Sequence, residues 1–106
     1  MTGIVSVYAV FADADEAERI ARAVVGERLA ACANILGPCR SIYRWQGRIE
    51  EADEVAAIFK TAEAAAPRLV ARIAALHSYE VPAITVWPIS EVPAPYAESV
   101  ATQSSG

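Results

Sequence analysis

Three side chains in this sequence could act as soft metal ligands, namely Cys32, Cys39 and His77. Thiolate sulfur and imidazole nitrogen are the ligands that copper and similar ions select. His77 is the only histidine of the chain, so a Ser-His-Asp or Cys-His catalytic arrangement would have to be built around this one residue. The sequence contains no Gly-x-Ser-x-Gly nucleophile elbow. These residues therefore favour a binding protein over an enzyme.

The two cysteines lie too far apart to pair if both belong to one strand. At about 3.3 Å per residue, the Cα atoms of Cys32 and Cys39 would be roughly 23 Å apart, whereas a disulfide requires about 5 to 6 Å. We therefore expect no disulfide within the chain, and a metal ion bound by both thiolates would need a second subunit or another type of ligand. The alternative interpretation is that both thiols are small buried apolar groups in a reducing compartment.

A run of acidic residues offers harder oxygen ligands, at Glu50, Glu51, Asp53 and Glu54. On a strand, Glu51 and Asp53 would point to one face and Glu50 and Glu54 to the other, so the four carboxylates cannot converge on one cation. We interpret the run as a solvated strand face that protects a sheet edge.

The chain has 106 residues, of which 55% are apolar and 21% charged, and this is typical of one globular domain over residues 1–106. A net charge of −4 with scattered basic residues argues against nucleic acid or an anionic membrane as a partner.

Residues 1–11 carry no basic leader or cleavage site, so we expect a strand there and a cytoplasmic protein. No apolar run reaches the ~18 residues of a membrane span. Residues 101–106 are expected to form a disordered tail.

The first half of the chain predicts a strand, a helix and a long second strand. Residues 4–11 (IVSVYAVF) are mostly β-branched or aromatic, as in a buried strand. Asp13 is a candidate helix N-cap, and Glu16 follows it in a capping-box arrangement. An amphipathic helix of about 14 to 17 residues should follow. Residues 31–45 are expected to be extended, with a bulge or bend at Gly37 and the proline after it.

The second half begins with a tight turn at Gln46 and Gly47, where glycine supplies the positive φ of a hairpin. By propensity alone, the segment after the turn would suit one alanine-rich helix, but Pro67 would interrupt it. Placed in the first turns of a shorter helix, Pro67 does little harm. The elements that we expect are a strand at 48–61, a helix at 64–77, a strand at 81–89 and a short helix around Tyr96.

This order predicts a ferredoxin-like α+β sandwich, in which an antiparallel sheet carries two helices on one face. Its two middle strands would form a hairpin of about 45 Å, while a compact domain of this length is roughly 33 Å across. The projecting tip would expose Ile42, Tyr43 and Trp45, and such an aromatic ribbon requires a cover. We therefore expect a closed ring of identical subunits, with no monomer at micromolar concentration.

Four separated blocks of the sequence resemble signature segments of the CutA family of divalent-cation tolerance proteins. They follow the family's order and spacing, and they are residues 29–35 (LAACANI), 41–47 (SIYRWQG), Lys60-Thr61 and 77–82 (HSYEVP). The resemblance implies a trimer of ferredoxin-like subunits, related in shape to the PII signalling proteins and associated with copper and other divalent cations. It implies no organic cofactor.

The resemblance also implies roles for particular residues. Cys32 of one subunit and His77 of another would hold a metal ion, although a single histidine at a helix C-terminus is also a common capping group. An intersubunit cleft with an aromatic wall would be formed by Tyr43, Trp45, Glu54, Lys60, Tyr79 and Glu80.

Two departures from the family pattern accompany the resemblance. Ser78 stands where the family usually has proline, which bears on the shape of the loop after His77. Ser99 stands where a tryptophan often follows the C-terminal tyrosine, here Tyr96, and this bears on the packing of the C-terminal segment.

Two functions remain open at this point. The first is a trimer that binds divalent cations, copper above all. The second is a PII-like regulatory module that binds an anionic metabolite in its intersubunit clefts and signals to a partner protein. The absence of a glycine-rich phosphate loop and of a basic cluster disfavours the second.

Overall fold

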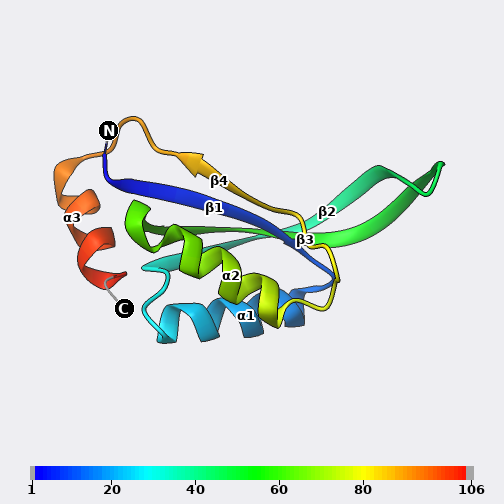
Figure 1. The fold of residues 1–106 in the computed structure, drawn as a ribbon, viewed down its shortest axis with the longest axis horizontal. Coiled ribbons are helices and arrows are strands. Elements are labelled where there is room, and N and C mark those ends of the chain that lie inside the picture. Colours follow the sequence, from blue (N-terminus) through cyan, green and yellow to red (C-terminus); the bar gives the residue numbers. More distant parts are fainter. Residues whose placement is uncertain (1, 105–106) are drawn as a thin grey trace.

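The structure, a computed structural model, describes residues 2–104. Its four strands form one antiparallel sheet in the order β2-β3-β1-β4. Both longer helices lie under one face of this sheet, and a third helix lies at its end (Figure 1). This is the ferredoxin-like sandwich that the sequence predicts. The elements are β1 (Ile4–Phe11), α1 (Ala14–Gly26), β2 (Cys32–Trp45), β3 (Arg48–Ala62), a 3-10 turn (Glu63–Ala65), α2 (Ala66–Leu76), β4 (Ile84–Pro88) and α3 (Ala94–Gln103).

The core lies between the sheet and helices α1 and α2. Alternate residues of a strand point to the same face, and one face of β1 and β3 is fully buried against the two helices. Burying each large apolar side chain of this layer contributes about 1.5 to 3 kcal/mol. The largest members are Val7 and Phe11 from β1, Ile20 and Val24 from α1, Phe59 from β3, and Leu69 and Ile73 from α2.

Helix α1 begins and ends with local signals. Oδ1 of Asp13 accepts the N–H of Glu16 at 2.8 Å, which confirms Asp13 as the N-cap. The helix has 13 residues, one fewer than the shortest length that we expected. It stops there because Arg28 adopts a left-handed φ of 61°, a conformation that ends a helix.

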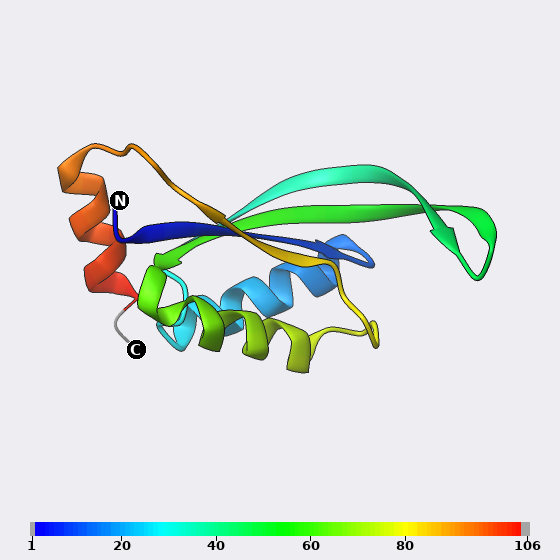
Figure 2. The same ribbon diagram turned by 45° about the horizontal axis from the view of Figure 1, so that its top comes forward.

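The β2–β3 hairpin is the longest feature of the molecule. Its turn places Gln46 at a φ of 50° and Gly47 at 78°, the two positive values of a type I′ turn, which matches the twist of the paired strands. A register shift between Ile35 and Gly37 marks the expected bulge. The hairpin tip extends well beyond the helices (Figure 2), and the molecule measures 45 × 26 × 22 Å.

The second half departs from the predicted boundaries in two places. Helix α2 starts at Ala66 because the three residues before it form a 3-10 turn, and Pro67 lies in its first turn as expected. Strand β4 covers five residues rather than nine, because the chain from Ser78 to Ala83 forms a loop in which Pro82 has no N–H to donate. No helix within residues 2–104 is long and apolar enough to cross a membrane.

The expected disordered tail at residues 101–106 is wrong for residues 101–104. Helix α3 continues to Gln103, and Ser104 is buried. Oγ of Ser104 accepts the N–H of Ala62 at 3.0 Å, which fastens the end of α3 to the end of β3. Val100 is buried beside it, while Ser99 faces solvent, so the segment packs without a large side chain at that position. Residues 105 and 106 lie outside the described residues.

Candidate functional site

His77 ends α2 and is held by its own chain through both ring nitrogens. Nδ1 accepts the backbone N–H of Tyr79 at 3.0 Å, so this nitrogen carries no proton, and Nε2–H donates to the carbonyl of Val10 at 2.7 Å. The ring also stacks on Phe11, with centroids 5.1 Å apart and planes 16° from parallel. A metal ion at either nitrogen would displace one of these hydrogen bonds.

Glu16 fixes the same loop from the side of α1. It is 6% exposed, Oε1 accepts the N–H of Ala12 at 3.0 Å, and Oε2 accepts the N–H of Ser78 at 2.7 Å. Burial by itself would raise the pKa of this carboxyl, but the hydrogen bonds from Ala12 and Ser78 outweigh it and lower the pKa. Proline at position 78 would have no N–H for this bond, so the serine gives the loop an additional attachment.

A cavity of about 670 Å³ opens between the base of the hairpin and the loop that follows α2. This volume falls in the range of small-molecule sites. The hairpin provides one wall, and the loop and the end of β1 provide the other. The lining residues are Val10, Ser41, Tyr43, Trp45, Glu54, Tyr79, Glu80, Val81 and Ala83.

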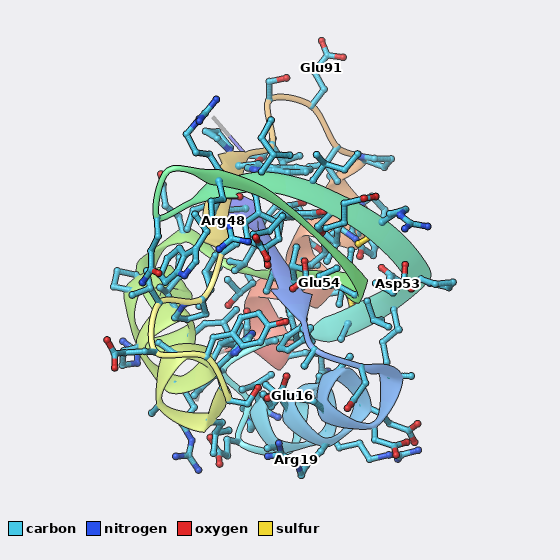
Figure 3. All side chains as sticks on the ribbon, turned by 90° about the vertical axis from the view of Figure 1, so that its right-hand side faces the viewer. Glu16, Arg19, Arg48, Asp53, Glu54 and Glu91 are labelled. Carbon is cyan, nitrogen blue, oxygen red and sulfur yellow. The ribbon has the colours of Figure 1, made fainter. Side chains whose placement is uncertain are left out.

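Glu54 is the buried acidic group of this cavity. Its side chain is 8% exposed, and Oε2 accepts the hydroxyl of Tyr79 at 2.6 Å. Burial, reinforced by this bond to Glu54, raises the pKa of Tyr79 well above the ordinary value of a tyrosine, so the phenol remains a hydrogen-bond donor. In Figure 3, which looks along the molecule from the hairpin end, Glu54 lies beneath the arch of the hairpin and Glu16 lies below it on α1.

The structure brings together five of the six residues expected in a cleft, and it does so within one chain. Tyr43, Trp45, Glu54, Tyr79 and Glu80 all line the cavity. The participation of a second subunit stays a prediction.

The sixth residue, Lys60, lies elsewhere on β3. Its Nζ donates to Oδ1 of Asn34 at 3.1 Å. This contact lies on the sheet face opposite α1 and α2, which we call the helix-free face because neither of these two helices covers it. Lys60 therefore does not line this cavity within one chain, and its expected place in a cleft across a subunit boundary stays a prediction.

Cys32 lies beside Lys60 on the helix-free face. The register places Cys32, Lys60, Ser6 and Trp87 in one rung across the sheet. Cys32 is half-buried, and its Sγ lies 3.5 Å from the hydroxyl of Tyr96 in α3. This contact, together with burial, raises the pKa of Tyr96. The thiol is therefore accessible, and it is not the fully buried apolar group of the alternative interpretation.

Cys39 lies on the hairpin, opposite Glu54 in the register. It is also a free, half-buried thiol.

The acidic residues of β3 lie in two different environments. Glu51 faces solvent and pairs with Arg40 at 3.1 Å, as a solvated strand face predicts, whereas Glu54 is buried, which corrects that interpretation for this residue.

Cys32 and His77 lie at opposite ends of the sheet within one chain. Cys32 pairs with Lys60, whereas Phe11, on which His77 stacks, pairs with Val55. Val55 and Lys60 are five residue steps apart on β3, which corresponds to about 17 Å at 3.3 Å per residue. Within residues 2–104, no three His, Cys, Asp or Glu side chains are placed to hold one metal ion. A site that uses both residues would require a second copy of the chain.

Comparison with known proteins supplies the family. Residues 5–103 match the family described as CutA1 divalent ion tolerance protein. The chain is 51% identical over 75 residues, which are 71% of this chain and 73% of the relative, to the divalent-cation tolerance protein CutA of Thermus thermophilus. It is 42% identical over 84 residues to human protein CutA, and this match covers 79% of this chain but only 47% of the human protein.

Solved structures of similar proteins share the fold along nearly the whole chain. The Thermus thermophilus divalent cation tolerance protein has a TM-score of 0.92 at 40% identity, covering 95% of this chain and 98% of that one. CutA1 of a psychrotrophic Shewanella has a TM-score of 0.94 at 32% identity, with 98% and 97% covered. CutA of Archaeoglobus fulgidus, described as periplasmic, has a TM-score of 0.92 at 33% identity, with 95% and 98% covered.

Proposed function

Because this chain belongs to the CutA1 divalent ion tolerance family, we propose that it binds divalent cations, copper above all, as a homotrimer. The observation that carries the proposal is the environment of Cys32. Its thiol is half-buried on the helix-free face, and its hydrogen-bond contact is to the hydroxyl of Tyr96 at 3.5 Å. A thiol is a weak hydrogen-bonding group, so Cys32 can give its sulfur to a soft metal ion at small cost.

His77 is the second ligand of the proposal, but metal binding would break a hydrogen bond that it already makes. Both of its ring nitrogens are hydrogen-bonded to backbone groups, and leaving a buried backbone group without its partner costs about 1 to 3 kcal/mol. His77 can therefore ligate a metal only if the loop after α2 opens. We place Cys32 first, with the remaining ligands supplied by a neighbouring subunit.

The surface of the single chain supports the assembly. Ile42 and Ile49 are 68% and 67% exposed on the hairpin, and Trp87 and Val86 are exposed on β4. Strands β2 and β4 are the two edges of the sheet, so each has backbone groups that can pair with another copy. Identical subunits in a closed ring would cover both features.

Titration with copper tests the metal proposal. Wild type, Cys32→Ser, His77→Gln and, as a matched thiol control, Cys39→Ser are titrated with Cu(II) by calorimetry, without oxygen and without added thiol, after the native mass of each has been measured. We expect Cys32→Ser to weaken binding by about tenfold or more, since one ligand is lost, and Cys39→Ser to change it by less than about twofold. Equal affinity in wild type and Cys32→Ser would contradict the proposal, and unchanged affinity in His77→Gln would leave His77 with a structural role alone.

A PII-like regulator is the second candidate, and the cavity beside Tyr43 and Trp45 favours it. Its lining residues include two carboxylates and no lysine or arginine, however, which disfavours an anionic metabolite. Calorimetry against ATP separates the two functions, because heat with ATP and none with copper would favour the regulator.

We also propose a cytoplasmic location, on the ground that both cysteines are free. Free thiols persist most readily in a reducing compartment. Fractionation of cells with a marker enzyme for each compartment tests this location.

A further inference from the structure

We propose that the cavity between the hairpin and the loop after α2 binds a small organic cation with an alkylammonium or guanidinium head group. This goes beyond the proposed metal function, because it uses a different place in the molecule and does not involve Cys32. It rests on one buried carboxylate, on the aromatic side chains around it, and on the sign of the charge at the cavity wall.

Glu54 supplies the charge. The hydroxyl of Tyr79 occupies Oε2, and no hydrogen bond to another described residue is found at Oε1. In the part of the chain that the structure describes, no fully buried side-chain oxygen or nitrogen lacks a hydrogen-bond partner. Oε1 must therefore be accessible, and the cavity that Glu54 lines provides this access. A carboxylate so largely removed from water is stabilised by a cation that it can contact.

The charges around the cavity leave this carboxylate uncompensated. The ion pairs within residues 2–104 join Glu16, Glu18, Glu27 and Glu51 to arginines, and none of them includes Glu54 or Glu80. Arg48 is opposite Trp45 in the register, next to the turn, but it does not line the cavity. The wall therefore has two acidic groups and no basic one.

The aromatic residues select the kind of cation. Tyr43, Trp45 and Tyr79 line the same cavity as Glu54, and the face of an aromatic ring attracts a cation within about 6 Å of its centroid. A volume near 670 Å³ holds an organic molecule, while the ring faces and neutral phenol hydroxyls of the aromatic side are poor ligands for a bare metal ion. An organic cation satisfies the rings and the carboxylate at once.

Fluorescence titration of the assembled protein tests the proposal. Trp87→Phe removes the indole that stacks on Tyr8 outside the cavity, which leaves Trp45 as the only tryptophan. Because Trp87 lies exposed on the edge strand β4, the native mass of this variant must first match that of wild type. The probes are choline, methylguanidinium and 3,3-dimethyl-1-butanol, which has the shape of choline without its charge. We expect saturable quenching by one or both cations, with choline or methylguanidinium binding at least about tenfold more tightly than the neutral alcohol.

Variants assign the binding to the residues. Glu54→Gln keeps an acceptor for Tyr79, so the fold should be retained, and cation affinity should fall by about tenfold or more. Glu51→Gln, a matched loss of charge outside the cavity, should change affinity by less than about twofold. Glu54→Gln should leave copper binding unchanged, and Cys32→Ser should leave choline binding unchanged, so this proposal and the metal proposal can fail separately.

Four results would overturn the proposal. The first is equal affinity for choline and the neutral alcohol, and the second is an unchanged affinity in Glu54→Gln. The third is binding by a dissociated form alone, since a side chain of another copy would then fill the cavity in the assembly. Absence of saturable binding by either cation, in the assembled and dissociated forms alike, would also overturn it.

Discussion

Oε2 of Glu16 accepts the backbone N–H of Ser78 at 2.7 Å, across 62 residues of sequence. Oε1 of the same carboxylate accepts the N–H of Ala12. One side chain thus ties the start of α1 to the loop after α2, and Tyr79 and Glu80 of that loop line the cavity. The shape of the cavity therefore depends on Glu16, although Glu16 does not line it.

Replacing Glu16 with alanine should destabilise the protein by about 2 to 3 kcal/mol, because two backbone N–H groups lose a charged acceptor. Urea unfolding at a fixed protein concentration measures the change. Glu18→Ala is the matched control, since Glu18 is an exposed glutamate two residues away that pairs with Arg22, and it should change stability by less than about 0.5 kcal/mol. Similar losses in the two variants would show that the buried hydrogen bonds of Glu16 contribute no more than a surface ion pair.

The same carboxylate should make stability depend on pH. Burial opposes ionisation of Glu16, but its hydrogen bonds prevail and lower the pKa in the folded state. Its contribution is therefore complete above the unfolded pKa of about 4.3 and is lost as the pH falls through the folded pKa. We expect the stability difference between wild type and Glu16→Gln to be largest at neutral pH and to narrow below about pH 5. Unfolding curves at constant ionic strength measure this difference, and a gap that widened in acid would contradict the assigned direction.

Proline at position 78 should weaken the loop. Ser78→Pro removes the N–H that Oε2 of Glu16 accepts, and the loss of a hydrogen bond to a charged group outweighs the gain from a stiffer unfolded chain, for a net cost of about 1 to 2 kcal/mol. Ser78→Ala keeps the amide and loses only the hydroxyl, so it should cost less than half as much. Thermal and urea unfolding of both variants tests this, and a Ser78→Pro variant as stable as wild type would contradict it.

Much of the fold was predictable because its signals are local. The apolar strand at residues 4–11, the N-cap at Asp13 and the turn at Gln46-Gly47 each determine structure within a few residues. The hairpin was also predictable, because strand length follows directly from residue count. The end of α3 was not, because Ser104 is ordered by a bond to Ala62, and no local signal in the sequence indicates that contact.

The site was predictable in composition but not in geometry. Five cleft residues were identified by resemblance, but the burial of Glu54 was not, since an acidic residue in a charged run ordinarily faces water. The second hydrogen bond of Glu16 was also missed. A capping box predicts that Glu16 accepts the N–H of the N-cap Asp13, but Oε1 accepts the N–H of Ala12 instead, and the bond to Ser78 depends on how two distant segments pack. The occupied nitrogens of His77 could not be read from sequence for the same reason.

Introducing charged residues on the apolar hairpin surface should dissociate the assembly. Ile42 and Ile49 are more than half exposed in the single chain, and lysine at both positions would place charge in an interface that lacks water. We expect light scattering at micromolar concentration to give about three times the 11.3 kDa chain mass for wild type and a value near one chain for Ile42→Lys/Ile49→Lys. Val25→Lys, on the exposed side of α1 beneath the sheet, is the control and should keep the wild-type mass. Circular dichroism must show a folded double variant, so that loss of mass reports the interface. A wild-type protein of one chain mass would remove the physical reason for a ring, because the projecting ribbon would then be stable without a partner. A double variant that stays assembled would show that Ile42 and Ile49 do not hold the subunits together.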